Sequence, residues 1–225
     1  MDNREPANAI RRYVNRDEDW LDFNELVLKE ASDPNLPLYE RIKFIAIFSS
    51  NLDEYFRIRV AALHKVATIK KTKTSEWLGF NIQELLLRIY QRVYQQQEEL
   101  GRLWKHVILK ELAENNIVLC TIDSIMPEQI KNLNPVFHNY IQAFLQVTIR
   151  SRRDARPFTM INNAAYLAVT LTQIKNSKSY IGYINIPSPA VTRFFHFETR
   201  NNIHYIIWLD DILRLHLDHI FPGYT

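Results

Sequence analysis

The sequence has one cysteine, four glycines and no long apolar run, and each scarcity excludes a class of protein. The single cysteine, Cys120, excludes internal disulfides and cysteine-based zinc sites, and it favours a reducing compartment. Four isolated glycines leave no glycine-rich phosphate loop. The N-terminal segment MDNREPANAIRRYVNRDEDW is charged, and no apolar run reaches membrane-spanning length. We therefore expect a cytoplasmic protein without a signal peptide or a transmembrane segment.

Apolar and aromatic residues, in contrast, are abundant. They make up 47% and 12% of the 225 residues, which is enough for the core of one large or two small domains. The formal net charge is only +3, so no global field marks the chain as a nucleic-acid binder. The HExxH motif and the nucleophile elbow are both missing. The composition predicts a globular protein, and the sequence contains neither of these two common catalytic motifs.

Helical periodicity dominates the first half of the chain. Apolar residues recur at spacings of three and four from Trp20 to Ala31, and the segment SDPNLP ends this pattern. A second apolar stripe runs from Leu38 to Leu63, and a third from Trp77 to Leu112. The third ends at Asn115-Asn116, residues that tolerate the left-handed conformation of a helix C-cap. Its length predicts one helix of roughly 55–60 Å, on which Gln95-Gln96-Gln97 is expected to form an exposed turn.

The second stripe contains an unusual polar segment. Ser49-Ser50-Asn51 and Asp53-Glu54 lie inside it, although short polar side chains compete for backbone hydrogen bonds and are disfavoured in helix interiors. The stripe keeps its phase on both sides, so any break must be short, either a kink or a new N-cap. Asn51 falls with Ile47 and Ile58 on a second, partly apolar side that something should cover. The trio is therefore either a helix boundary or a site.

The second half of the chain has mixed character. Strand-like composition occurs in Ile117–Cys120 and in residues 164–173, 178–187 and 202–209, whereas helical spacing occurs in residues 127–145, with an interruption at Asn134-Pro135, and in residues 208–221. The predicted fold class is α+β. An all-α helical bundle with one long helix, residues 10–116, precedes an α+β domain with a mostly antiparallel sheet and helices on one face, residues 117–225.

Histidines and arginines are the remaining candidates for chemistry. His216 and His219 lie beside Asp218 on the last helix, but two ligands do not make a metal site, and a structural role is favoured. None of the seven histidines is predicted to be a catalytic base or a metal ligand. Four arginines lie in the segment IRSRRDAR, where they could grip phosphates through forked hydrogen bonds: Arg150, Arg152, Arg153 and Arg156. The alternative for this segment is a solvated interdomain or hairpin loop.

A long stretch of the sequence resembles a known family. Residues 17–63, DEDWLDFNELVLKEASDPNLPLYERIKFIAIFSSNLDEYFRIRVAAL, look like the N-terminal domain of bacterial polyphosphate kinase of the phosphohistidine type. The SNLDE motif, Ser50 to Glu54, and the following Arg59 occur in the family's order and spacing. YLAV at 166–169 and the closing LDDILRLHLDHIFPGY resemble the family's head domain. Two departures are Ser50, where the family usually has asparagine, and VTIRSRRDARPF, where a proline-rich acidic stretch is usual.

The resemblance implies an activity and a site. Polyphosphate kinase transfers the γ-phosphate of ATP to inorganic polyphosphate, and Asn51 would contact the base and ribose of ATP in a lid over the nucleotide pocket. An uncharged amide suits this task because it both donates and accepts hydrogen bonds. Asp53 and Glu54 are then expected to be helix-start residues, since carboxylates would repel phosphates. The four arginines become candidate polyphosphate-binding residues.

The resemblance also implies partners. ATP and Mg would be bound mainly by C-terminal catalytic domains of the same enzyme, which carry the phosphorylated histidine, so no catalytic residue is predicted in this chain and the chain alone is expected to be inactive. Homo-oligomers would form through the head domain. The alternative is a non-catalytic interaction module that binds polyphosphate or nucleic acid. A reading frame that continues past Thr225 would favour the enzyme.

Overall fold

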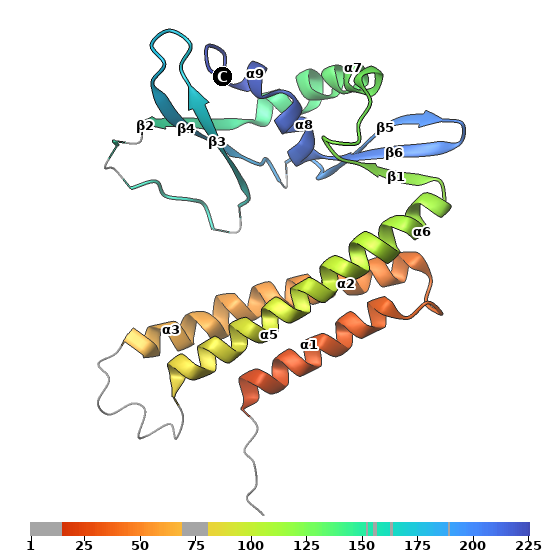
Figure 1. The fold of residues 1–225 in the computed structure, drawn as a ribbon, viewed down its shortest axis with the longest axis vertical. Coiled ribbons are helices and arrows are strands. Elements are labelled where there is room, and N and C mark those ends of the chain that lie inside the picture. Colours follow the sequence, from red (N-terminus) through yellow and green to blue (C-terminus); the bar gives the residue numbers. More distant parts are fainter. Residues whose placement is uncertain (1–14, 69–80, 152, 155–156, 163, 189) are drawn as a thin grey trace, which may run out of the picture. The chain divides into compact units, whose positions relative to one another are not determined.

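The computed structural model describes residues 15–68, 81–151, 153–154, 157–162, 164–188 and 190–225. The chain divides into two compact units between Glu111 and Leu112, five residues before the boundary expected from the sequence. The first unit is helical, and the second combines helices with strands (Figure 1). The predicted fold class is therefore confirmed.

Two helices of the first unit begin at asparagines whose side chains cap free backbone amides. The Oδ1 of Asn15 accepts a hydrogen bond from the amide of Asp17 at 2.9 Å, and the Oδ1 of Asn81 accepts one from Gln83 at 3.0 Å. The helices are α1 (Arg16–Ser32), α2 (Leu38–Tyr55), α3 (Ala61–Thr68), α5 (Ile82–Leu103) and α6 (Leu109–Glu114). Short π-helical turns, η1 (Phe56–Val60) and η2 (Trp104–Ile108), join α2 to α3 and α5 to α6.

Helix α2 is continuous through Ser49, Ser50 and Asn51, so the predicted kink or N-cap at this trio is wrong. The irregularity lies one turn later, at η1. The reason is that the Asn51 side chain bonds to Asn24 on the neighbouring helix and not to its own backbone. Asp53 and Glu54 consequently lie in the last turn of α2, which corrects their interpretation as helix-start residues.

The third helical pattern follows its prediction at the C-terminal end. Asn116 has a φ of 62°, the left-handed conformation expected after the helix. The predicted start at Trp77 lies outside the described residues. The expectation of an exposed glutamine turn is wrong for Gln96, which is 3% exposed and donates from Nε2 to the carbonyl of Leu21 at 2.8 Å. Its sequence neighbours Gln95 and Gln97 are exposed.

The apolar stripes of α1, α2 and α5 meet in a common core, which includes Leu21, Leu28, Phe48, Leu52, Leu85 and Ile89. The charged side chain of Arg41 is buried with them. Arg41 is 2% exposed and donates from Nε to the carbonyl of Ala31 at 2.9 Å, while its Nη1 contacts both carboxylate oxygens of Glu111 at 2.7 and 2.8 Å. Arg41 thus connects the end of α1 to α6.

The α+β unit contains two three-stranded sheets instead of one. The strands are β1 (Ile117–Cys120), β2 (Gln146–Ser151), β3 (Tyr166–Thr172), β4 (Ser179–Asn185), β5 (Phe194–Arg200) and β6 (Ile203–Trp208). One sheet has the order β1-β6-β5, with β1 parallel to β6, and the other is antiparallel with the order β2-β4-β3. Strands β2 and β5 were not predicted from the sequence.

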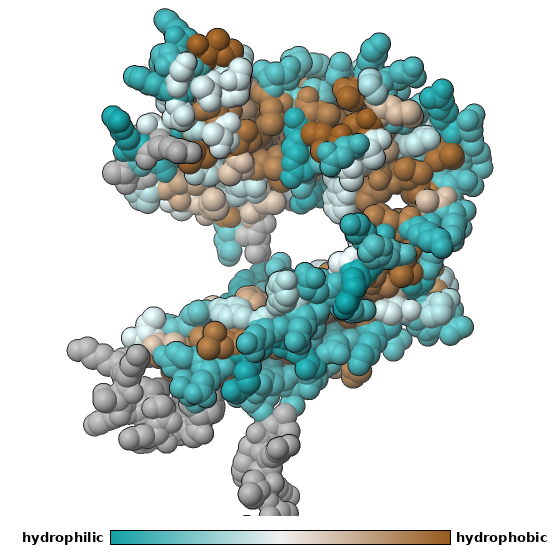
Figure 2. Space-filling view, viewed as in Figure 1, coloured by the Kyte–Doolittle hydropathy of each residue, from teal (hydrophilic) through white to brown (hydrophobic). Residues whose placement is uncertain are grey.

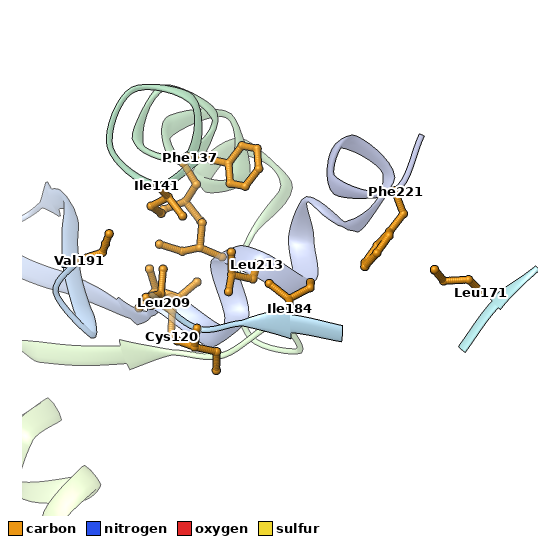
Figure 3. Close-up of a cluster of buried hydrophobic side chains, with 13 residues drawn as sticks. Cys120, Phe137, Ile141, Leu171, Ile184, Val191, Leu209, Leu213 and Phe221 are labelled. Atoms are coloured by element: carbon orange, nitrogen blue, oxygen red, sulfur yellow. The ribbon is translucent and has the colours of Figure 1, made fainter. Parts of the chain in front are cut away.

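Helices α7 (Pro127–Val136), α8 (Leu209–Leu215) and α9 (Leu217–Ile220) complete this unit. The interruption predicted at Asn134-Pro135 is wrong, because α7 includes Pro135 and continues through a π-helical turn, η3 (Phe137–Ile141), and a 3-10 turn, η4 (Gln142–Phe144). Figure 3 shows side chains of these helices converging on the strands in a buried cluster that includes Cys120, Ile184 and Leu213.

The two units differ in hydropathy on the face of the molecule that Figure 2 shows. On the face shown in Figure 2, hydrophilic residues cover most of the helical unit, whereas hydrophobic residues reach the surface over more of the α+β unit. Among the described residues, no helix is both long and apolar enough to span a membrane.

Candidate functional site

Asn51 and Asn24 form a pair of side-chain amides between α2 and α1. Asn24 is fully buried, and its Nδ2 donates to the carbonyl of Phe48 at 3.3 Å. Its Oδ1 must therefore accept, and it does so from the Nδ2 of Asn51 at 3.1 Å. This chain of hydrogen bonds fixes which way the half-buried Asn51 amide points. Within the described part of the chain, no group donates to the Oδ1 of Asn51, so this oxygen is an oriented acceptor.

The surface around Asn51 is partly apolar. Ile47 and Ile58 lie on the same side of the helix, one turn before and two turns after Asn51, and are 46% and 54% exposed. On α1, Phe23 is 57% exposed next to the buried Asn24. The sequence predicted that this side needs a cover, and within the described residues these apolar side chains remain open. A neutral acceptor among apolar groups suits a flat, weakly polar ligand such as a nucleobase.

A hollow of about 240 Å³ lies beside the end of α2. Trp20 and Tyr55 form part of its wall, stacked with their ring centroids 4.4 Å apart. The hydroxyl of Tyr55 donates to the carbonyl of Asp17 at 3.1 Å, and burial followed by the nearby Asp17 charge raises the pKa of Tyr55. The widened η1 turn carries Arg59, whose Nε donates to Asp17 at 2.8 Å. Arg59 of the sequence motif thus holds the start of α1 against the end of α2.

The arginine segment is partly a strand. Arg150 belongs to β2, and its Nη2 lies 3.3 Å from the Oδ1 of Asp154, so its charge is matched within the segment. Its guanidinium also lies 5.9 Å from the ring centre of Phe158. Arg153 is exposed. Arg152 and Arg156 lie outside the described residues.

His216 is buried, and both its ring nitrogens and its ring face have close neighbours. His216 lies within 2.8 Å of the carbonyl of Ile212 through Nδ1 and 3.0 Å from the Oδ1 of Asn134 through Nε2, and its ring stacks on Phe137 at 4.2 Å. Burial lowers the pKa of His216, which favours the neutral ring. His219 is exposed and pairs with Asp218 at 3.0 Å.

Metal ligands and the single thiol were the other groups considered for chemistry. Among the described residues, no group of three or more His, Cys, Asp or Glu side chains is arranged to hold a metal ion. Burial and the charge of Glu198 raise the pKa of Cys120, which makes its thiol a poor nucleophile.

The sequence made Asn51 a candidate and assigned no role to Asn24. A polar residue on the core-facing side of an amphipathic helix was the available signal, because buried amides require partners. The partner itself could not be predicted, since Asn51 is 27 residues away in the sequence.

Two family models match successive parts of the chain. The model of the polyphosphate kinase N-terminal domain matches residues 13–120, and the model of the polyphosphate kinase middle domain matches residues 128–225. The chain belongs to the polyphosphate kinase family, as its resemblance implied.

Individual relatives agree with this assignment. The polyphosphate kinase of Halalkalibacterium halodurans is 33% identical over 227 residues, which cover 100% of this chain and 31% of the relative. That of Escherichia coli K12 is 33% identical over 215 residues, or 94% of this chain and 30% of the relative. The crystal structure of polyphosphate kinase from Porphyromonas gingivalis matches with a TM-score of 0.80 and 33% identity, over 94% of this chain and 31% of that one. The chain thus spans about a third of the length of these relatives.

Proposed function

We propose that this chain is the N-terminal and middle part of an enzyme that transfers the γ-phosphate of ATP to inorganic polyphosphate. In this proposal C-terminal domains supply the phosphorylated histidine and the magnesium ion, and the helical unit supplies a nucleotide contact through Asn51. Family membership supports the reaction. The observation that supports the proposed nucleotide contact is the oriented, open Oδ1 of Asn51 beside the buried Asn24.

The chemistry of Asn51 fits the base and ribose of ATP better than its phosphates. An amide oxygen can accept from the exocyclic amine of adenine or from a ribose hydroxyl, and it carries no charge that would repel phosphate. Because Asn24 already fixes the amide, nucleotide binding would cost little side-chain entropy. The apolar Ile47 and Ile58 would pack against the flat base.

The proposal includes the cellular context implied by the family. We expect the intact enzyme to be a cytoplasmic phosphoprotein that forms homo-oligomers through the α+β unit. The alternative, a non-catalytic module that binds polyphosphate or nucleic acid, predicts no ATP-dependent phosphoryl transfer by the intact protein.

Replacement of Asn51 in the intact enzyme, made by joining this chain to its C-terminal domains, tests the nucleotide contact. Loss of one neutral hydrogen bond costs about 0.5–1.5 kcal/mol, so Asn51→Ala should weaken ATP affinity by about two- to twelvefold. Ser49→Ala, an exposed change on the same helix, is the control and should leave the affinity unchanged.

Asn24→Ala separates a direct contact from a packing effect. It breaks the same pair of amides but keeps the Oδ1 of Asn51, so it should reduce ATP affinity less than Asn51→Ala does. Equal losses in the two variants, or unchanged ATP affinity in a folded Asn51→Ala enzyme, would contradict the contact.

A further inference from the structure

The outer face of the β5–β6 hairpin brings together three polar side chains that regular strands would separate. Thr199 pairs directly with His204 across the hairpin, and a bulge lies between His196 and Glu198. Residues three apart on a regular strand point to opposite faces, but the extra residue of the bulge, Phe197, returns His196 and Thr199 to one face. Phe197 packs against the core, whereas the two histidines and Thr199 are exposed.

The two imidazoles lie at the separation of two ligands of one ion. The Nε2 of His196 and the Nδ1 of His204 are 3.5 Å apart, which is long for a direct hydrogen bond. Two nitrogens that bind one tetrahedral Zn²⁺ at about 2.0–2.1 Å are separated by about 3.4 Å. The Oγ1 of Thr199 lies 3.0 Å from the first nitrogen and 3.2 Å from the second.

We propose that His196 and His204, which the sequence did not single out as metal ligands, supply two ligands of an open divalent transition-metal site that water completes, with Zn²⁺ as the reference case. Neutral imidazole suits Zn²⁺, Cu²⁺ and Ni²⁺, whereas Mg²⁺ prefers oxygen ligands and should not bind here. The two imidazoles leave further coordination positions for water, and the Thr199 hydroxyl is placed to hold such a water molecule. The site is therefore open and exchangeable, unlike a structural site closed by four protein ligands.

The facing nitrogens of His196 and His204 share one neighbour, the Thr199 hydroxyl, whereas the other neighbouring histidines have separate partners. In His216 both ring nitrogens already have partners. His138 and His219 have ring centroids 5.4 Å apart, and their Nδ1 atoms face Gln142 and Asp218. They provide matched controls, because they too are close, exposed histidines in the same unit.

Calorimetric titration of the metal-free 225-residue chain with zinc chloride, in excess Mg²⁺, tests the site. His196→Ala and His204→Ala should each weaken zinc binding more than about tenfold, since loss of even an outer partner of a metal ligand costs 10–100-fold. His138→Ala and His219→Ala should leave the affinity unchanged. Thr199→Val should weaken binding by less than loss of either histidine.

Thermal unfolding gives a second measurement. Because a metal bound only by the folded state stabilises it by mass action, zinc should raise the melting temperature of the wild-type chain and not of His196→Ala. Far-UV circular dichroism verifies that each variant is folded. Wild-type zinc affinity in His196→Ala or His204→Ala, or its loss in His138→Ala or His219→Ala, would overturn the assignment.

Discussion

Removal of the Asn51 side chain from the 225-residue chain should destabilise the helical unit. Asn24 is fully buried, and the Nδ2 of Asn51 is the donor to its Oδ1 at 3.1 Å. Asn51→Ala therefore leaves a buried acceptor unpaired, which costs about 1–3 kcal/mol. Alanine is the better helix former by up to about 0.7 kcal/mol, so part of this loss is offset. We expect a net loss of roughly 0.3–3 kcal/mol in the free energy of unfolding.

A double-mutant cycle isolates the amide pair. Asn24→Ala alone also removes the bond to Phe48 and leaves a cavity, so its single effect is larger and mixed. Urea unfolding of the two single variants and the double variant, followed by far-UV circular dichroism, gives the coupling between the two side chains. The coupling should be about 0.5–1.5 kcal/mol, the range of one neutral hydrogen bond.

A coupling near zero would refute the orientation assigned to Asn51. In that case the amide would not be fixed by Asn24, and the acceptor proposed for ATP would lose its structural basis. Ser49→Ala should change the free energy of unfolding by no more than about 0.5 kcal/mol, because its side chain is exposed.

The remaining predictions concern packing, a buried charge and the arginine segment. A Cβ at Gly182 would lie 2.6 Å from an aromatic ring atom, so Gly182→Ala should destabilise the α+β unit by roughly 1–3 kcal/mol in urea unfolding. Gly101 has open space around it in α5, so Gly101→Ala should stabilise by up to about 1 kcal/mol, and equal effects of the two changes would contradict the packing described. Glu111→Gln leaves the guanidinium of Arg41 buried without its counter-charge and should cost roughly 3 kcal/mol; a loss below about 1 kcal/mol would show that the pair contributes little. Arg153→Ala should weaken polyphosphate binding by the intact enzyme and flatten its salt dependence, whereas unchanged binding would assign the segment to an ordinary loop.

The sequence by itself determined the parts of this protein that depend on local patterns. Apolar spacings of three and four placed the helices, and β-branched and aromatic runs placed β1, β3, β4 and β6, because each pattern reflects the period of its own backbone. The left-handed Asn116 was also predictable, since asparagine tolerates that conformation. The motif around Asn51 was sufficient to indicate the family.

Sequence reasoning failed where a partner far along the chain decides a local conformation. Ser49, Ser50 and Asn51 have the composition of a helix boundary, yet α2 continues because Asn24 takes the Asn51 amide as its partner. Gln96 is buried because a carbonyl of α1 accepts its amide.

The division of the strands into two sheets also depended on the tertiary structure. Strand β2 consists of exposed and partly exposed residues, so its sequence has no strong hydrophobic period, and pairing with β4 decides its conformation. In β5 a single extra residue shifts the alternation and places His196 beside Thr199 and His204. Such a bulge cannot be predicted from local periodicity, because the position of a bulge is set by the register with the opposite strand.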